Sequence, residues 1–207
     1  MIAGLWKLSA ADCAKLNLKD EYAVHKAVYS LFPDNRSAED KKKDISSGFQ
    51  YADKGGGYNS RMILLLANRE PVAPSCGELD LKPVTVDFLS ADYYGFQVIM
   101  NPVKRDKKSA KAVPVKGREN LIKWFCGKAE NSWGFIADEN KLDVSGMSAV
   151  IFSKNGSTDI TYNKAVFKGV LTVKDRKKFQ ESFTHGIGKA RAFGFGLLEL
   201  VPLLKNN

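Results

Sequence analysis

The sequence predicts an α+β fold made of two tandem ferredoxin-like domains, each with the element order β-α-β-β-α-β. A strand, a helix and a strand pair follow one another in residues 2–69, and strand, helix and strands return in the same order after residue 95. The two halves share this order without letter-by-letter similarity. We therefore divide the chain into an N-terminal domain of residues 1–90 and a C-terminal domain of residues 91–207.

The first half begins with a predicted strand at residues 2–8. Residues 21–32 (EYAVHKAVYSLF) predict a helix, because their apolar residues recur at three- and four-residue steps. Asp20 can cap the start of this helix, and Pro33 ends it. Between these elements we expect a polar connection.

Two strands that turn at Gly55 to Gly57 are predicted within residues 49–69, and residues 83–89 (PVTVDFL) alternate as a further strand. Tyr93 to Gly95 are interpreted as the corner between the two halves. The second half then predicts strands at 95–102, 148–154, 162–173 and 196–203, and helices at 118–129 and 174–184.

Composition points to a polyanionic partner. The 207 residues include 32 Lys and Arg against 23 Asp and Glu, which gives a net charge of +9. A solvated basic surface would have the same balance. The three cysteines lie far apart and outside metal-binding spacing, and no signal peptide or membrane span is recognisable. We expect a soluble cytoplasmic protein without a metal site.

A glycine-rich loop at residues 185–196 joins a predicted helix to the last strand. Its glycines surround two cations, so main-chain N–H groups could face a phosphate. A glycine-rich turn that lets the helix pack closely on a sheet explains the same pattern. The candidate phosphate-contacting residues are Gly186, Gly188, Lys189, Arg191, Gly194 and Gly196.

The strongest charge cluster in the chain lies in residues 101–118, which contain a single acid, Asp106. Two prolines and scattered small residues predict a loop or an extended arm. A flexible, solvated connection and a phosphate-binding face are both compatible with such a run. The candidate phosphate-binding residues are Lys104, Arg105, Lys107, Lys108, Lys111 and Lys116.

One of the two histidines, His25, lies on the predicted first helix, with Tyr22 three residues before it and Lys26 directly after it. Residues at i and i+3 project from the same side of a helix. An imidazole that titrates near neutrality, a phenol and an ammonium could together move protons at a phosphate. An ordinary histidine beside a packed tyrosine is the simpler interpretation of the residues alone.

Four segments together resemble the CasE family of CRISPR RNA-processing endoribonucleases, which belong to the Cascade complex. They are EYAVHKAVYSLFP, GFQVIMNPVKR, AVFKGVLTV and GIGKARAFGFGLLELVPL, and they occur in the family's order and approximate spacing. The resemblance extends from the first helix to the C-terminus.

The resemblance implies a tandem ferredoxin-like protein that binds the stem-loop of a CRISPR repeat transcript. It also implies one metal-independent and cofactor-independent cut at the 3′ base of the stem by the RNA's own 2′-hydroxyl, after which the protein stays bound in Cascade. The family's catalytic histidine matches His25, its tyrosine matches Tyr22, and Lys26 occupies the basic position that follows. Two alternatives stay open: a non-cleaving RNA-binding subunit, and a basic protein that binds another structured nucleic acid.

Overall fold

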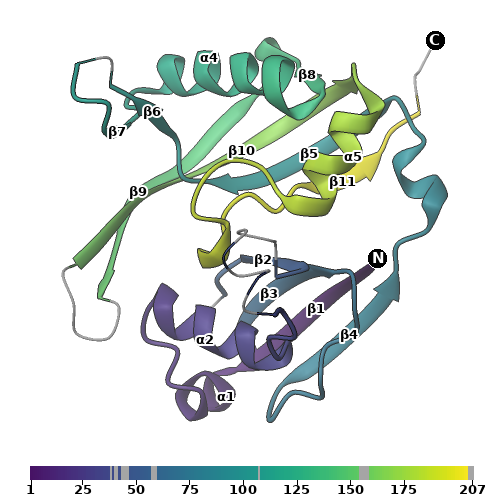
Figure 1. The fold of residues 1–207 in the computed structure, drawn as a ribbon, viewed down its shortest axis with the longest axis vertical. Helices are drawn as coiled ribbons and strands as arrows, with labels where there is room; N and C mark the ends of the chain where they lie inside the picture. The colour runs from purple at the N-terminus through teal and green to yellow at the C-terminus, as the bar shows by residue number, and fades with distance from the viewer. Residues whose placement is uncertain are drawn as a thin grey trace.

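The computed structural model describes residues 1–37, 39, 42, 47–56, 60–106, 108–153 and 159–204. Two antiparallel sheets lie one above the other, and the helices α2 and α4 lie on the sides of the sheets that face away from each other (Figure 1). The chain therefore forms two helix-on-sheet units that contact each other through their sheets.

The first sheet has the strand order β2-β3-β1-β4, and each neighbouring pair is antiparallel. This is the strand order of a ferredoxin-like domain. Residues 68–77, all of them described, contain no helix where the second helix of such a domain would lie. The elements are β1 (Ile2–Ser9), α1 (Ala10–Lys15), α2 (Glu21–Leu31), β2 (Phe49–Asp53), β3 (Ser60–Ala67) and β4 (Glu78–Pro83).

The second sheet has the order β11-β5-β10-β8, and β9 pairs with the long strand β10. Both helices of the ferredoxin-like pattern are present here, which confirms the predicted fold class. The elements are β5 (Tyr93–Met100), β6 (Val103–Arg105), β7 (Ala112–Pro114), α4 (Arg118–Lys128), β8 (Phe135–Ala137), β9 (Asp143–Ser153), β10 (Asp159–Val173), α5 (Arg176–His185) and β11 (Glu199–Pro202).

Three local predictions were wrong. The strand expected at 83–89 is instead β4, which ends at Pro83, followed by a short 3₁₀ helix, Val86–Leu89. Val86 is 93% exposed, so its alternating pattern does not mark a buried face. Residues Tyr93 to Gly95, expected to form a corner, instead belong to strand β5. The Tyr94 ring is buried there, and its hydroxyl donates to the Phe88 carbonyl at 2.8 Å.

The third concerns the expected loop or arm at residues 101–118, which contains the β6–β7 hairpin. The short helix α1 and the three-residue strand β8 were not predicted. Helix α1 begins with a capping box in which Ser9 and Asp12 exchange side-chain and backbone hydrogen bonds. The spacing of Ser9 and Asp12 that forms this capping box is recognisable in the sequence.

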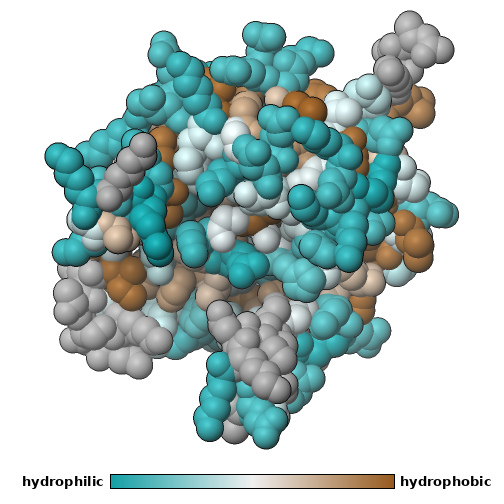
Figure 2. Space-filling view, turned by 45° about the horizontal axis from the view of Figure 1, so that its top comes forward, coloured by the Kyte–Doolittle hydropathy of each residue, from teal (hydrophilic) through white to brown (hydrophobic). Residues whose placement is uncertain are grey.

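The apolar core has three parts. One lies between the first sheet and α2, and a second lies between the second sheet and its two helices. The third joins the facing sides of the two sheets through Ala52, Leu66, Ile99, Phe183, Phe195 and Leu197. The face shown in Figure 2 is mostly hydrophilic, with small separate apolar patches. The sheet-to-sheet core fixes the loop after α5 against β2.

The three cysteines are free thiols. Within the described ranges, no helix has the length and hydropathy needed to cross a membrane.

Candidate functional site

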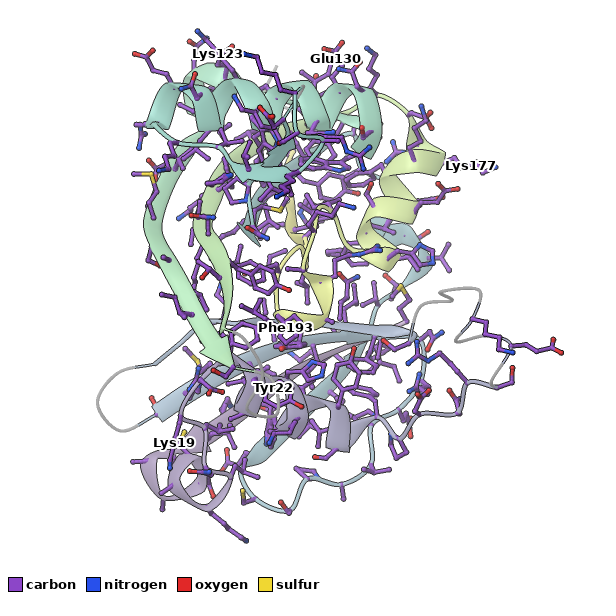
Figure 3. The ribbon with its side chains drawn as sticks, turned by 60° about the vertical axis from the view of Figure 1, so that its left-hand side comes forward. Lys19, Tyr22, Lys123, Glu130, Lys177 and Phe193 are labelled. Carbon is purple, nitrogen blue, oxygen red and sulfur yellow. The ribbon has the colours of Figure 1, made fainter. Side chains whose placement is uncertain are left out.

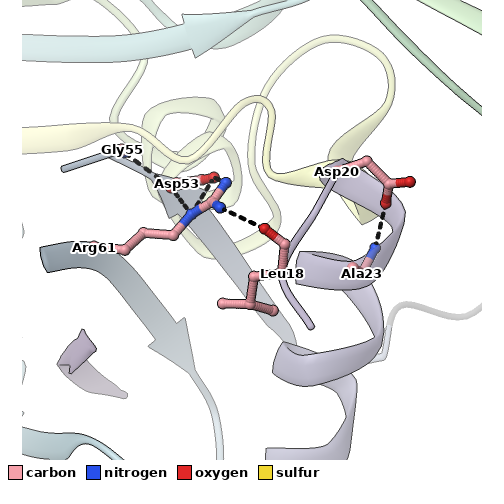
Figure 4. Close-up of polar contacts among 6 residues, drawn as sticks. All are labelled: Leu18, Asp20, Ala23, Asp53, Gly55 and Arg61. Atoms are coloured by element: carbon pink, nitrogen blue, oxygen red, sulfur yellow. Dashed lines mark hydrogen bonds and ion pairs between the residues drawn. The ribbon is translucent and has the colours of Figure 1, made fainter. Parts of the chain in front are cut away.

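The start of helix α2 is fixed by polar contacts from two directions (Figure 4). Asp20 is the N-cap, and its side chain accepts a hydrogen bond from the Ala23 N–H at 2.8 Å. Arg61 forms an ion pair with Asp53 and donates to the Leu18 carbonyl just before the helix. The Asp53 carboxylate raises the pKa of the Arg61 guanidinium. These contacts hold the first turn of α2, where Tyr22 lies.

His25 connects this helix to the glycine-rich loop at the other end of the chain. Its Nδ1 lies 2.6 Å from the carbonyl oxygen of Ala192. A carbonyl oxygen can only accept, so Nδ1 carries the hydrogen and donates it. The bond therefore fixes the orientation of the imidazole ring against the loop.

Aromatic rings pack around His25. Its ring centroid is 4.0 Å from that of Tyr29 and 5.0 Å from that of Phe193. The Tyr22 ring stacks at 5.9 Å with an interplanar angle of 13°, and Lys26 Nζ lies 4.9 Å from the Tyr22 centroid. Figure 3 shows Tyr22 on α2 directly below Phe193 of the loop. The three residues predicted as catalytic thus lie together at the surface where the two halves meet.

Sequence reasoning missed the second half of this cluster. Tyr29 follows His25 by four residues on the same helix, so helical spacing could have identified it. Ala192 and Phe193 lie in the short 3₁₀ turn Arg191–Phe193, and nothing in their spacing relates them to α2. Only the folded chain brings them together.

The glycines of the loop divide into two kinds. Gly194 and Gly196 are buried, and added Cβ atoms would lie 2.8 Å from the Tyr51 ring and 2.0 Å from the Ile187 carbonyl oxygen. For these two the close-packing explanation applies, because their surface is not available to a ligand. All four glycines have positive φ values, and Cβ atoms added at Gly186 and Gly188 would also lie close to side chains, but these two glycines are at least partly exposed. The cations Lys189 and Arg191 are exposed as well.

The basic hairpin faces the same loop. A cavity of about 610 Å³ separates them, and cations from three parts of the chain border it. They are Lys104 and Arg105 of β6, Lys128 at the end of α4, and Lys189 of the loop. Lys128 was not predicted, since its helix position alone marks it only as a surface residue. The structure therefore joins two basic segments that the sequence separates by about 80 residues.

The remaining predicted basic residues lie elsewhere. Lys108 and Lys111 are exposed at the turn of the hairpin, and Lys107 lies outside the described residues. Lys116 borders a different cavity of about 280 Å³, together with Lys164. Lys116 therefore does not border the cavity between the β6–β7 hairpin and the glycine-rich loop. In the part of the chain that the structure describes, no cluster of three His, Cys, Asp or Glu residues could hold a metal ion.

Comparison with known proteins places this geometry in a family. Residues 7–202 match the family model described as "CRISPR associated protein". The CRISPR system Cascade subunit CasE of Escherichia coli (strain K12) is 26% identical over 211 residues, which covers 95% of this chain and 99% of that protein.

Two solved structures share the fold. Thermus thermophilus Cse3, solved with an RNA that represents a pre-cleavage complex, gives a TM-score of 0.77 at 18% identity, covering 98% of this chain and 100% of the other. Cas6e from E. coli K-12 gives a TM-score of 0.72 at 21% identity, with the same coverage. The family match spans nearly the whole chain and agrees with the resemblance that its motifs carry. The chain belongs to the CRISPR associated protein family, as a member of the CasE type.

Proposed function

We propose that this protein is an endoribonuclease that binds the stem-loop of a CRISPR repeat transcript, cuts it at the 3′ base of the stem, and stays bound to the product within Cascade. One observation carries the proposal: the Nδ1–H of His25 donates to a loop that also borders the cation-lined groove. A proton-transfer group thus lies beside a surface suited to RNA phosphates. The curated relative is a Cascade subunit, and the solved relatives include a CRISPR endoribonuclease bound to RNA.

The chemistry needs few groups. The 2′-hydroxyl loses its proton to solvent and attacks the adjacent phosphorus. An O2′–P bond forms, the P–O5′ bond breaks, and the products carry a 2′,3′-cyclic phosphate and a 5′-hydroxyl. We assign proton transfer to His25 Nε2, as the acid that protonates the leaving 5′-oxygen. Tyr22 orients the phosphate, and Lys26 offsets its developing negative charge. The attacking group is already part of the RNA, so positioning replaces activation of a bound water.

Binding relies on the shape and charge of the stem. A-form RNA hides its major-groove base edges and presents phosphates and 2′-hydroxyls. We assign the stem to the groove between the β6–β7 hairpin and the glycine-rich loop, where its phosphates meet Lys104, Arg105 and Lys189. We also propose the domain boundary near residue 90, between the last strand of the first sheet and β5, and a cytoplasmic site of action, where the transcript is made.

The proposal is tested with purified protein and its cognate repeat hairpin in excess EDTA. We expect a single cut, and no cut in the same RNA with one 2′-deoxy nucleotide just upstream of the cleavage position. Mass spectrometry of the product should find the cyclic phosphate. If both RNAs bind and neither is cut, the protein is a non-cleaving guide-RNA subunit. If unrelated hairpins bind equally well at raised salt, it is a general binder of structured RNA.

The salt dependence of binding provides a second prediction. Lys189→Gln and Lys104→Gln should each lower the slope of log K against log salt concentration by about 0.7 to 0.9, because each lysine displaces about one counterion from the RNA. Electrophoretic or fluorescence titrations across a range of salt concentrations measure the slope. The matched control is Lys19→Gln, since Lys19 lies far from the groove in Figure 3 and should leave the slope unchanged. An unchanged slope in both groove variants contradicts the assigned path of the stem.

A further inference from the structure

A second cavity lies on the other side of the glycine-rich loop. Its volume is about 380 Å³, within the range of about 300 to 1,000 Å³ that holds small ligands. Gly188 and Lys189 border both this cavity and the basic groove. An RNA strand that crosses the loop at Lys189 therefore passes from one cavity to the other.

The lining of this cavity combines aromatic rings with cations. Five rings come from four elements: Tyr29 of α2, Phe49 and Tyr51 of β2, Tyr162 of β10 and Phe193 of the loop. The cations are Lys189, Arg191 and Arg36, and Arg36 forms an ion pair with Asp34. Aromatic rings that stack on bases, beside cations that hold phosphates, are typical of sites for unpaired nucleotides.

The guanidinium of Arg191 is already oriented. Its Nη1 donates to the His185 carbonyl at 3.0 Å, and both residues line the cavity. The charge therefore does not need to be ordered when a ligand enters.

The cavity is also next to the reacting group. Tyr29 and Phe193, which line it, are two of the three rings that pack on His25. A nucleotide held there would lie directly beside the phosphate that His25 serves.

We propose that this cavity binds the first unpaired nucleotide on the 3′ side of the cut, with its base among the aromatic rings and its flanking phosphate on Lys189 and Arg191. This inference rests on the proposed function, because it assigns the nucleotide that follows the scissile phosphate. Entry of this nucleotide draws the RNA across the loop and strains the phosphate toward in-line geometry.

The first test does not depend on cleavage. The RNA carries a 2′-deoxy nucleotide upstream of the cut, which blocks the reaction, and 2-aminopurine as the first base downstream. On binding to the wild-type protein we expect its fluorescence to fall by about threefold, as stacking on aromatic rings quenches it. The same probe placed three nucleotides further downstream should change little. Equal fluorescence of the free and bound forms at the first position overturns the proposal.

The second test compares cleavable RNA that is intact or abasic at that nucleotide. We expect wild-type kcat/KM to fall by about tenfold for the abasic RNA, since one stacked base is lost. If intact and abasic RNA are cut at equal rates, this inference is wrong and the proposed function stands. If neither RNA is cut, the proposed function is wrong.

Discussion

His25→Ala is expected to lower the single-turnover cleavage rate by about 10²- to 10⁴-fold, the usual contribution of general acid–base catalysis. The variant removes the imidazole whose Nδ1–H donates to the Ala192 carbonyl and to which we assign proton transfer. RNA affinity should stay within about twofold, because the phosphate-contacting cations are unchanged. The rate is measured with excess protein over labelled hairpin, and the affinity with the uncleavable 2′-deoxy RNA.

The pH dependence of the same reaction identifies the step. If His25 protonates the leaving oxygen, the wild-type rate falls as the pH rises and the imidazole loses its proton. If His25 is the base, the rate rises over the same range. The variant should lose this dependence in either case. Lys19→Ala, which removes a side chain just before α2 and away from the cluster, is the control and should cut normally. Near-normal cutting by His25→Ala would mean that His25 contributes only to packing.

What could be predicted from the sequence follows from how local each signal is. Helix α2, its Asp20 cap and the shared face of Tyr22 and His25 depend on residues within one or two turns of each other, and all three are found. The strand order of the two sheets follows from the order of elements once the ferredoxin-like pattern is recognised.

The partner of His25 could not be predicted in this way. The atom that orients its ring is a main-chain carbonyl 167 residues away, and a main-chain carbonyl has no sequence signature. The same holds for the groove, because Lys104 and Lys189 share a cavity only after the loop has packed on β5. At 83–89 the alternating pattern predicted a strand, although Val86 faces solvent. An alternating pattern indicates a strand only where the segment can pair with a neighbouring strand and bury one of its faces.

Gly196 lies in the loop that positions His25. Gly196→Ala should lower the free energy of unfolding by about 3 to 5 kcal/mol, which is among the larger effects of single substitutions. Gly196 has a φ of +85°, where an alanine is strained by about 1 to 3 kcal/mol. Its added Cβ would also lie 2.0 Å from the Ile187 carbonyl oxygen, a backbone atom that cannot move aside easily. Urea denaturation followed by circular dichroism measures the loss.

Cleavage should fall together with stability, because the hydrogen bonds of Gly196 hold the loop together and to β5. Gly196 N–H donates to the Ile99 carbonyl at 2.7 Å, and its own carbonyl accepts from Ile187 N–H at 2.9 Å. Relief of the clash breaks these bonds and moves Ala192 away from His25. Gly127→Ala is the control: this glycine is exposed within α4 with nothing within 4 Å, so alanine should stabilise the helix by about 0.5 to 1 kcal/mol. A Gly196→Ala protein as stable and active as the wild type would mean that the loop does not position the histidine.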